Sequence, residues 1–202
     1  MSQTLSRRSF LKDTALASTE AFIAGVAPVA AAAAQAHDAA PPAEQIAELT
    51  LRVNGSAHAL RLAPETTLAD ALRGPLGLSG TKIACDRGAC SACTVWLDGR
   101  PVCSCMLLAL DAEGHEITTI EGLARGDALH PVQAAFIEHD ALQCGFCTPG
   151  MVMSCAALLE QTPRPDAEQV KQALAGHLCR CGSYPHVLEA MLDLAGSPER
   201  RP

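Results

Sequence analysis

Apolar and polar residues alternate along the first regular segment of the chain. Between positions 49 and 53 every second residue is apolar, and a similar alternation resumes between 58 and 62. A period of two is typical of strands with one buried face, and the intervening Asn54-Gly55 pair is a strong signal for a tight hairpin turn. The pattern therefore predicts a β-hairpin. Further strands are predicted over residues 94–97, 100–105 and 116–120, with a second hairpin turn at Asp98-Gly99.

One short helix is predicted between these strands, over Pro64–Arg73, because Leu68, Ala69 and Leu72 share a helical face. Several glycines follow before the predicted strand at residue 94: Gly74, Gly77, Gly80 and Gly88. Glycines this frequent predict a loop without regular structure. A small mixed sheet crossed by one helix is a β-grasp arrangement. We expect it over residues 47–122.

After Gly122 the period of the pattern becomes helical. Proline at a first helical position, preceded by a polar cap, marks a helix start. By these criteria helices are predicted over 131–140, from Thr148-Pro149 to Pro163, from Asp166 to 175, and from Ser183 onward with Pro185 in its first turn. The predicted fold class is thus α+β, with the β-grasp domain followed by a four-helix domain over residues 123–202.

The N-terminal region has the pattern of an export signal. Ser6–Lys12 matches the twin-arginine signature S-R-R-x-F-L-K, a weakly hydrophobic segment follows, and Ala34-Gln35-Ala36 forms a small-x-small cleavage site. We therefore predict a twin-arginine signal peptide over 1–36, a linker over 37–46 and a periplasmic location. The alternative is a chance pair of arginines before an amphipathic helix. The twin-arginine route carries folded proteins, which suits a cofactor that is inserted before export.

Composition narrows the functional classes. The formal charge of −7 argues against nucleic acid and anionic membranes as main partners, and we expect no stable membrane insertion. Aromatic residues make up only 3% of the chain, so we expect the stability of the fold to depend on aliphatic side chains and on any bound metal. The residues suggest no catalytic base or nucleophile; the histidines at 130, 139, 177 and 186 are expected in helix-cap or surface roles.

Eight of the ten cysteines form two quartets with metal-site spacing. The first reads C-x4-C-x2-C-x11-C, which begins like a plant-type [2Fe–2S] ferredoxin site, and the second is a C-x2-C followed by a distant C-x-C. The members are Cys85, Cys90, Cys93 and Cys105, and then Cys144, Cys147, Cys179 and Cys181. The spacing of the second quartet is also compatible with structural zinc.

The local sequence around each quartet suits an anionic cluster. Gly88 lets the backbone wrap close to the first site without a side chain in the way. Cys144 and Cys147 come immediately before a predicted helix start, where free amides and the helix dipole favour thiolates. Two such sites on one chain predict a relay for single electrons. Cys103 and Cys155 are expected to be small buried hydrophobes, with a disulfide between them as the alternative.

Three motifs resemble a known family. They are Gly80-Thr-Lys-Ile-Ala-Cys-Asp-Arg-Gly-Ala-Cys-Ser-Ala-Cys-Thr-Val with the later Asp98-Gly-Arg-Pro-Val-Cys-Ser-Cys; Gln143-Cys-Gly-Phe-Cys-Thr-Pro-Gly-Met; and Leu178-Cys-Arg-Cys-Gly-Ser-Tyr. Together they resemble the iron–sulfur subunits of the xanthine dehydrogenase/aldehyde oxidoreductase family of molybdenum hydroxylases. With the export signature, the chain is most similar in character to periplasmic aldehyde oxidoreductases.

The resemblance implies two [2Fe–2S] clusters here, and a molybdopterin cofactor of the cytosine dinucleotide type and FAD on partner subunits. It implies that the second quartet lies next to the molybdenum centre and the first lies toward flavin or an external electron acceptor. Gln143 matches the glutamine that contacts the pterin. The expected partners are a large molybdenum-binding subunit, an FAD-binding subunit and that acceptor, and the expected reaction is aldehyde oxidation to a carboxylic acid.

Two departures from the family pattern occur, and neither removes a ligand. Ser91 stands where glycine is usual, and Gly182-Ser183 replaces the common Thr-Gly order. Two other functions stay open. One is a flavin-free hydroxylase of heteroaromatic rings that passes electrons to a cytochrome. The other, from a different class, is a zinc-stapled exported module that binds another protein.

Overall fold

The computed structural model describes residues 46–196. The predicted signal peptide (1–36) and nearly all of the predicted linker (37–46) lie outside the described residues, so both stay predictions. These described residues belong to one compact unit. Within the described range, no helix is both long and apolar enough to cross a membrane.

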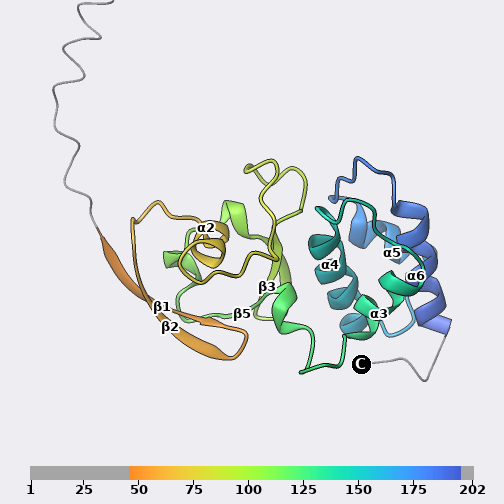
Figure 1. Cartoon of the computed structure of the whole chain (residues 1–202), viewed down its shortest axis with the longest axis horizontal. Coiled ribbons are helices and arrows are strands. Elements are labelled where there is room, and N and C mark those ends of the chain that lie inside the picture. The colour runs from red at the N-terminus through yellow and green to blue at the C-terminus, as the bar shows by residue number, and fades with distance from the viewer. Residues whose placement is uncertain (1–45, 197–202) are drawn as a thin grey trace, which may run out of the picture. The chain divides into compact units, whose positions relative to one another are not determined.

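A five-stranded mixed sheet forms the first half of the described chain (Figure 1). Its strands lie in the order β2-β1-β5-β3-β4, in which only the β1–β5 pair is parallel. Both predicted hairpin turns are confirmed: Asn54-Gly55 and Asp98-Gly99 all have positive φ, the conformation of a tight type I′ turn. The strands are β1 Ala47–Val53, β2 Ser56–Leu62, β3 Thr94–Leu97, β4 Arg100–Cys103 and β5 Glu116–Thr118.

The helix α2, Leu68–Arg73, crosses one face of this sheet, as the β-grasp prediction requires (Figure 1). Its buried Leu68 and Leu72 pack with Leu51 and Ile117 of the strands. The predicted start at Pro64 is wrong, because the Thr67 hydroxyl accepts a hydrogen bond from the backbone N–H of Asp70 and begins the helix there. The predicted strand 100–105 also ends early, at Cys103, where a short 3₁₀ helix over Ser104–Met106 takes over.

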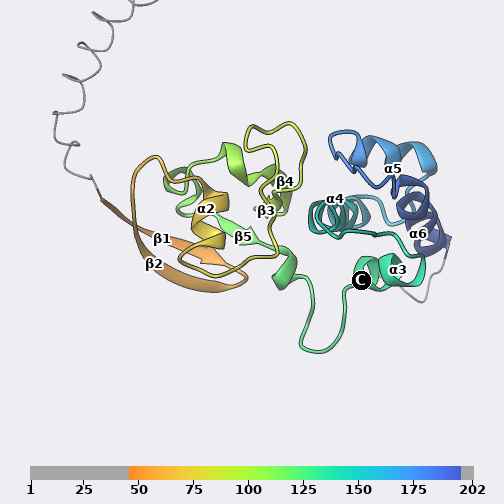
Figure 2. The same cartoon turned by 45° about the horizontal axis from the view of Figure 1, so that its top comes forward.

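Four helices form the second half, as predicted (Figure 2). Asp166 caps the third helix of this half as expected, and its carboxylate accepts from the backbone N–H of Gln169. Thr148 does not have its predicted capping role: it is the first helical residue, and Cys147 occupies the cap position without a side-chain hydrogen bond. The helices are α3 Pro131–Glu138, α4 Thr148–Gln161, α5 Ala167–Leu174 and α6 Tyr184–Gly196.

The strand β3 joins the two halves because its side chains alternate between two cores. Val95 packs on the α2 side, whereas Trp96 packs with the buried residues of the helices. Both β3 and β4 contact α4. The connection from β5 to α3 begins with a short 3₁₀ helix at Ile120–Gly122. The predicted domain boundary after residue 122 stays a prediction.

Candidate functional site

The first cysteine quartet lies on the loop between α2 and β3 and on the 3₁₀ helix after β4. Cys90, Cys93 and Cys105 are buried and Cys85 is half-buried. The loop wraps tightly, with Asp86, Gly88 and Ser91 all at positive φ. Gly88 has φ of +67°, a conformation that favours glycine, and a Cβ atom there would lie 2.9 Å from Cγ of Met106.

Backbone amides of this loop point at the sulfurs. The N–H of Gly88 donates to Sγ of Cys105 at 3.4 Å, and the N–H of Ala89 donates to Sγ of Cys85 at 3.2 Å. The backbone N–H of Arg87 and the neighbouring thiol of Cys90 lower the pKa of Cys85 to about 7. Burial raises the pKa of Cys105 to about 11. Donors to sulfur stabilise the thiolate form, which is the form that binds metal.

Ser91, one of the two departures from the family pattern, is accommodated in the left-handed conformation, with φ of +56°. Its carbonyl accepts hydrogen bonds from the backbone N–H of Thr94 at 3.2 Å and from the Thr94 hydroxyl at 2.7 Å. These contacts hold a conformation that L-residues otherwise disfavour by about 1–2 kcal/mol. At the other departure, Gly182 has φ of +82°, so glycine stands where the backbone requires it.

The second quartet lies next to the ends of helices. Cys144 and Cys147 precede α4, and Cys179 and Cys181 lie on the loop between α5 and α6. Cys147 is buried, Cys179 is half-buried, and the other two are exposed. Burial pushes the pKa of Cys179 upward, but hydrogen bonds from Ser183 outweigh it and lower the pKa to about 6. Burial raises the pKa of its neighbour Cys147 to about 12.

The thiols of each quartet lie close enough to interact with one another. In the first quartet Cys105 interacts with Cys85 and Cys93, and Cys85 with Cys90. In the second, Cys147 interacts with Cys144 and Cys179, and Cys181 with Cys144 and Cys179. Four thiols are the ligand set of a [2Fe–2S] cluster and also of a structural zinc ion. The fold therefore brings the members of each predicted quartet together.

The remaining candidate residues lie as follows. Gln143 is exposed beside the exposed Cys144. Cys155 is fully buried in the core of the helices, where burial raises its pKa to about 12. Cys103 packs instead against Cys93 and Cys105. Cys103 and Cys155 are both free thiols and belong to separate groups of packed apolar side chains. We expected both to be small buried hydrophobes. Cys155 is fully buried, whereas Cys103 is only half-buried.

One polar pair in the helical half escaped the sequence-based interpretation. Nε2 of His177 lies 2.8 Å from the hydroxyl of Ser154, and both side chains are buried. Burial lowers the pKa of His177 to about 4, so the ring is neutral. The expected helix-cap or surface role is thus wrong for His177, although it is right for His130, which caps α3. No periodicity in the sequence indicates that the side chain of His177 is buried, since its neighbours Gly176 and Leu178 are exposed.

Two domain families match the chain. The family described as "2Fe-2S iron-sulfur cluster binding domain" matches residues 51–122, and the family described as "[2Fe-2S] binding domain" matches residues 119–192. Between them they include all eight cysteines of the quartets.

Curated relatives are also similar over most of their length. The aldehyde oxidoreductase iron-sulfur-binding subunit PaoA of Escherichia coli (strain K12) is 42% identical over 95% of this chain and 89% of its own. The nicotine 6-hydroxylase small subunit of Paenarthrobacter nicotinovorans is 46% identical over 77% of this chain and 93% of its own.

Solved structures share the fold at similar identity. Quinoline 2-oxidoreductase from Pseudomonas putida 86 matches with a TM-score of 0.73 and 41% identity, over 77% of this chain and 98% of the matched chain. The aldehyde oxidoreductase from Desulfovibrio desulfuricans ATCC 27774 matches with a TM-score of 0.69 and 42% identity, over 74% of this chain and 17% of the much longer matched chain.

Proposed function

The chain belongs to the iron–sulfur subunits of the xanthine dehydrogenase/aldehyde oxidoreductase family of molybdenum hydroxylases, and we propose the direction in which it passes electrons. They enter from the molybdenum–pterin centre of a large subunit at the second quartet and leave from the first, toward flavin or an external acceptor. The observation that carries this proposal is that both cysteine quartets lie in one compact unit, with hydrogen-bonding groups against the sulfurs of each.

The eight quartet cysteines are the proposed ligands: Cys85, Cys90, Cys93 and Cys105 of the first cluster, and Cys144, Cys147, Cys179 and Cys181 of the second. When bound, a [2Fe–2S] cluster accepts and gives up one electron at a time. Some of the chain's own groups lie against these sulfurs and favour the thiolate form. At the first site the amides of Gly88 and Ala89 do this, and at the second the Ser183 hydroxyl lies 3.2 Å from Sγ of Cys179. Binding of the irons releases the thiol protons that burial retains.

The surface around the second quartet is the proposed contact with the large molybdenum-binding subunit. Cys144 and Cys181 are exposed there, and large apolar side chains next to them in sequence are exposed as well: Leu142, Phe146 and Leu178. Exposed apolar groups of this size, grouped around polar ones, mark a protein interface. The exposed Gln143 is the residue that we expect to reach the pterin.

Aldehyde oxidation is the proposed reaction of the assembled enzyme, with the substrate bound on the large subunit. It is favoured by the similarity to PaoA, whose match covers 95% of this chain and so includes part of the region before residue 46. Hydroxylation of a heteroaromatic ring is the second candidate, because nicotine 6-hydroxylase and quinoline 2-oxidoreductase are similar at the same level of identity.

We further propose export to the periplasm by the twin-arginine pathway, on the evidence of the Ser6–Lys12 signature. An FAD-binding subunit is the proposed next carrier, with direct transfer to a cytochrome as the alternative. The subunits that co-purify with the chain show whether the next carrier is an FAD-binding subunit or a cytochrome. Fractionation of disrupted cells tests the periplasmic location.

The test is low-temperature EPR, with iron and zinc analysis, on the dithionite-reduced complex purified without oxygen. We expect two distinct S = 1/2 signals and about four irons per chain, two for each cysteine quartet. Zinc without a signal would overturn the relay and favour the zinc-stapled module. One signal together with zinc would reassign the second quartet.

A further inference from the structure

The hydroxyl of Ser183 lies against the sulfur of a proposed ligand. Its Oγ is 3.2 Å from Sγ of Cys179, a hydrogen-bonding distance for sulfur. A thiolate that binds iron carries no proton and can only accept a hydrogen bond, so Ser183 is the donor when the cluster is bound. Ser183 belongs to one of the two departures from the family pattern, and it supplies a hydroxyl that the usual glycine lacks.

A tight turn brings Ser183 back onto Cys179. Within this turn Gly182 has φ of +82°, the left-handed conformation that glycine adopts without strain. The backbone N–H groups of Gly182 and Ser183 also form hydrogen bonds with the sulfur of Cys179. Several donors therefore converge on one ligand sulfur, and the hydroxyl is the donor that a substitution removes without altering the backbone.

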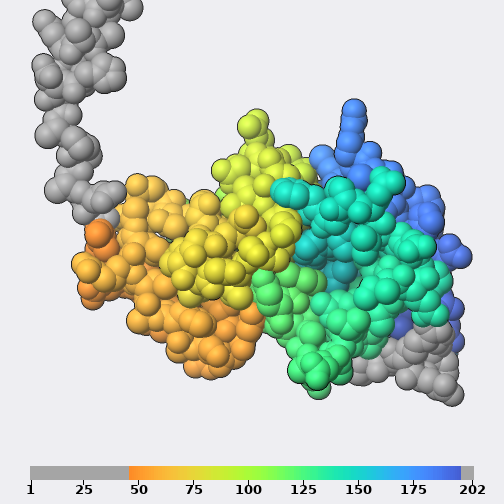
Figure 3. Space-filling model, in the orientation of Figure 1, coloured from red at the N-terminus to blue at the C-terminus, as the bar shows by residue number. Residues whose placement is uncertain are grey.

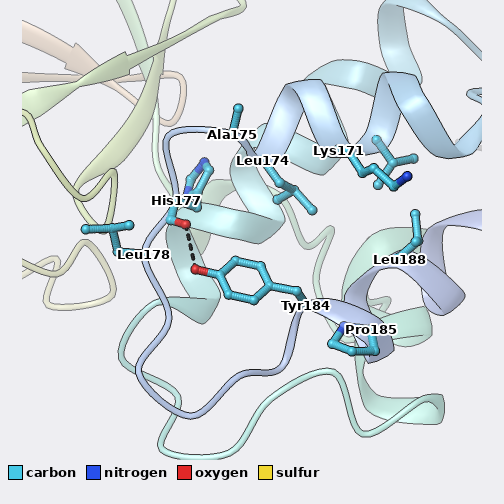
Figure 4. Close-up of a pocket in the computed structure, with 9 residues that line it drawn as sticks. Lys171, Leu174, Ala175, His177, Leu178, Tyr184, Pro185 and Leu188 are labelled. Carbon is cyan, nitrogen blue, oxygen red and sulfur yellow. Dashed lines mark hydrogen bonds between the residues drawn. The ribbon is translucent and has the colours of Figure 1, made fainter.

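Side chains hold the start of this turn in place (Figure 4). The Tyr184 hydroxyl donates to the carbonyl of His177 at 2.9 Å, drawn as the dashed line in Figure 4, and accepts from the N–H of Cys179 at 2.7 Å. The buried ring of His177 in turn lies 2.8 Å from the hydroxyl of Ser154 of α4. The turn is thus closed on itself and anchored to α4, so the surrounding structure sets the position of Ser183 relative to Cys179.

The contact between Ser183 and Cys179 is largely shielded from water. Ser183 is only 7% exposed and Cys179 is half-buried. A hydrogen bond is electrostatically stronger in such surroundings than in water. In Figure 3 the blue segment that carries this turn reaches the surface of the molecule, so a partner subunit that covers it shields the bond further. The effect of the bond therefore has to be measured in the assembled complex.

We propose that the Ser183 hydroxyl, by donating to the sulfur of Cys179, raises the reduction potential of the second cluster. The proposal rests on the proposed function. Reduction adds one electron, and so one negative charge, to the cluster and its ligand sulfurs; no proton is transferred. A donor at the sulfur stabilises the more negative, reduced form more than the oxidised form. The higher potential makes the second cluster a better acceptor for electrons from the molybdenum centre.

The test is a redox titration of the complete complex, followed by low-temperature EPR. We expect Ser183→Ala to lower the equilibrium constant for reduction of the second cluster about tenfold, an effect typical of one hydrogen bond to a charged group. For one electron this is a shift of about 59 mV to lower potential. Ser183→Thr is the matched control that retains the hydroxyl and should keep the wild-type potential. The potential of the first cluster should not move in either variant.

Ser183→Gly is a second variant without the hydroxyl, and it decides the matter if Ser183→Ala loses its cluster. It introduces the residue that is usual in the family, and the same shift to lower potential is expected. An unchanged potential of the second cluster in Ser183→Ala or Ser183→Gly overturns the proposal. A shift of equal size in Ser183→Thr overturns it too, because the hydroxyl would not be the cause. Failure of the proposed function looks different: the wild-type complex would then show no second [2Fe–2S] signal to titrate.

Discussion

The indole N–H of Trp96 donates a hydrogen bond of 2.9 Å to the carbonyl oxygen of Met153. The bond is buried, and it connects β3 of the sheet to the middle of α4. Trp96 is the single tryptophan of the chain and is only 6% exposed. It therefore provides both apolar area and a directional contact at the junction of the two halves.

Replacement of Trp96 by Phe keeps an aromatic ring and removes the N–H donor. We expect the free energy of unfolding to fall by about 1 kcal/mol, the usual net value of a buried hydrogen bond. Trp96→Ala also loses the packed ring and should lose about 3–5 kcal/mol. Urea unfolding of the iron-loaded protein measures both. Equal stabilities of the Phe variant and the wild type would show that the bond contributes nothing.

A second substitution, at Gly150, tests the contact between α4 and the loop that carries the first quartet. Gly150→Ala places a methyl group 2.3 Å from the Ser91 carbonyl oxygen, and overpacking of this kind lowers stability by about 1–3 kcal/mol. The control is Gly196→Ala, because nothing lies within 4 Å of a Cβ atom at that position of α6; its effect should stay within about 0.5 kcal/mol. Thermal unfolding of the two variants and the wild type measures the difference. Equal melting temperatures of the two variants would contradict the predicted overpacking at Gly150.

The features that could be predicted from sequence are those with local causes. The turns at Asn54-Gly55 and Asp98-Gly99 have positive φ at both residues because Asn, Asp and Gly tolerate that conformation. The helix at Ala167 begins where Asp166 supplies a cap. The four helices follow from apolar spacing in the same way. The spacing of the cysteines along the chain is likewise a local feature, and it predicts both quartets.

The features that escaped prediction depend on contacts between distant parts of the chain. Nothing near Leu178 in sequence indicates that its N–H bonds Cys90, and nothing near His177 indicates its burial against Ser154. Thr148 has the chemistry of a helix cap, but α4 begins at Thr148 itself, with Cys147 at the cap position. Tertiary packing decides these positions, and a local pattern does not report it.

The choice between Cys103 and Cys105 as the fourth ligand of the first site is directly testable. Sγ of Cys105 receives the amide of Gly88, whereas Cys103 lies at the end of β4, with Sγ 3.9 Å from the Ser91 hydroxyl. Cys105→Ser should reduce the iron content from about four to about two atoms per chain and remove one of the two EPR signals. Cys103→Ser should leave both unchanged. Loss of iron in Cys103→Ser alone would reverse the assignment.

The order of the relay predicts the effect of interrupting it at the second site. Cys147→Ser should leave the molybdenum centre of the partner subunit reducible by substrate, because that centre is bound on another chain. Turnover with the external acceptor should stop, because the second quartet is the proposed entry point. Anaerobic substrate titration followed by visible absorption, together with steady-state rates, separates the two steps. Unimpaired turnover with the acceptor would contradict the relay.

His130 predicts how the stability of the helical half changes with pH. Its Nδ1 accepts a hydrogen bond of 3.2 Å from the N–H of Val132 and caps α3, and a protonated ring nitrogen cannot accept. Burial, with a smaller contribution from Arg125, lowers the pKa of His130 below its ordinary value of 6.5. Between the lowered pKa and 6.5 the unfolded chain binds more protons than the folded chain, so the stability that this group contributes is present above pH 6.5 and is lost as the pH falls below it.

His130→Asn isolates this effect, because asparagine is a good cap residue that does not titrate. Between about pH 7.5 and about pH 5.5 the wild type should lose more unfolding free energy than the variant, since only the wild type takes up this proton on unfolding. Groups that do not contact residue 130 are the same in both proteins, and their contributions cancel in the difference. Denaturant unfolding across this range, monitored by far-ultraviolet circular dichroism, gives the two slopes. Parallel slopes would mean that the cap bond does not depend on the neutral ring.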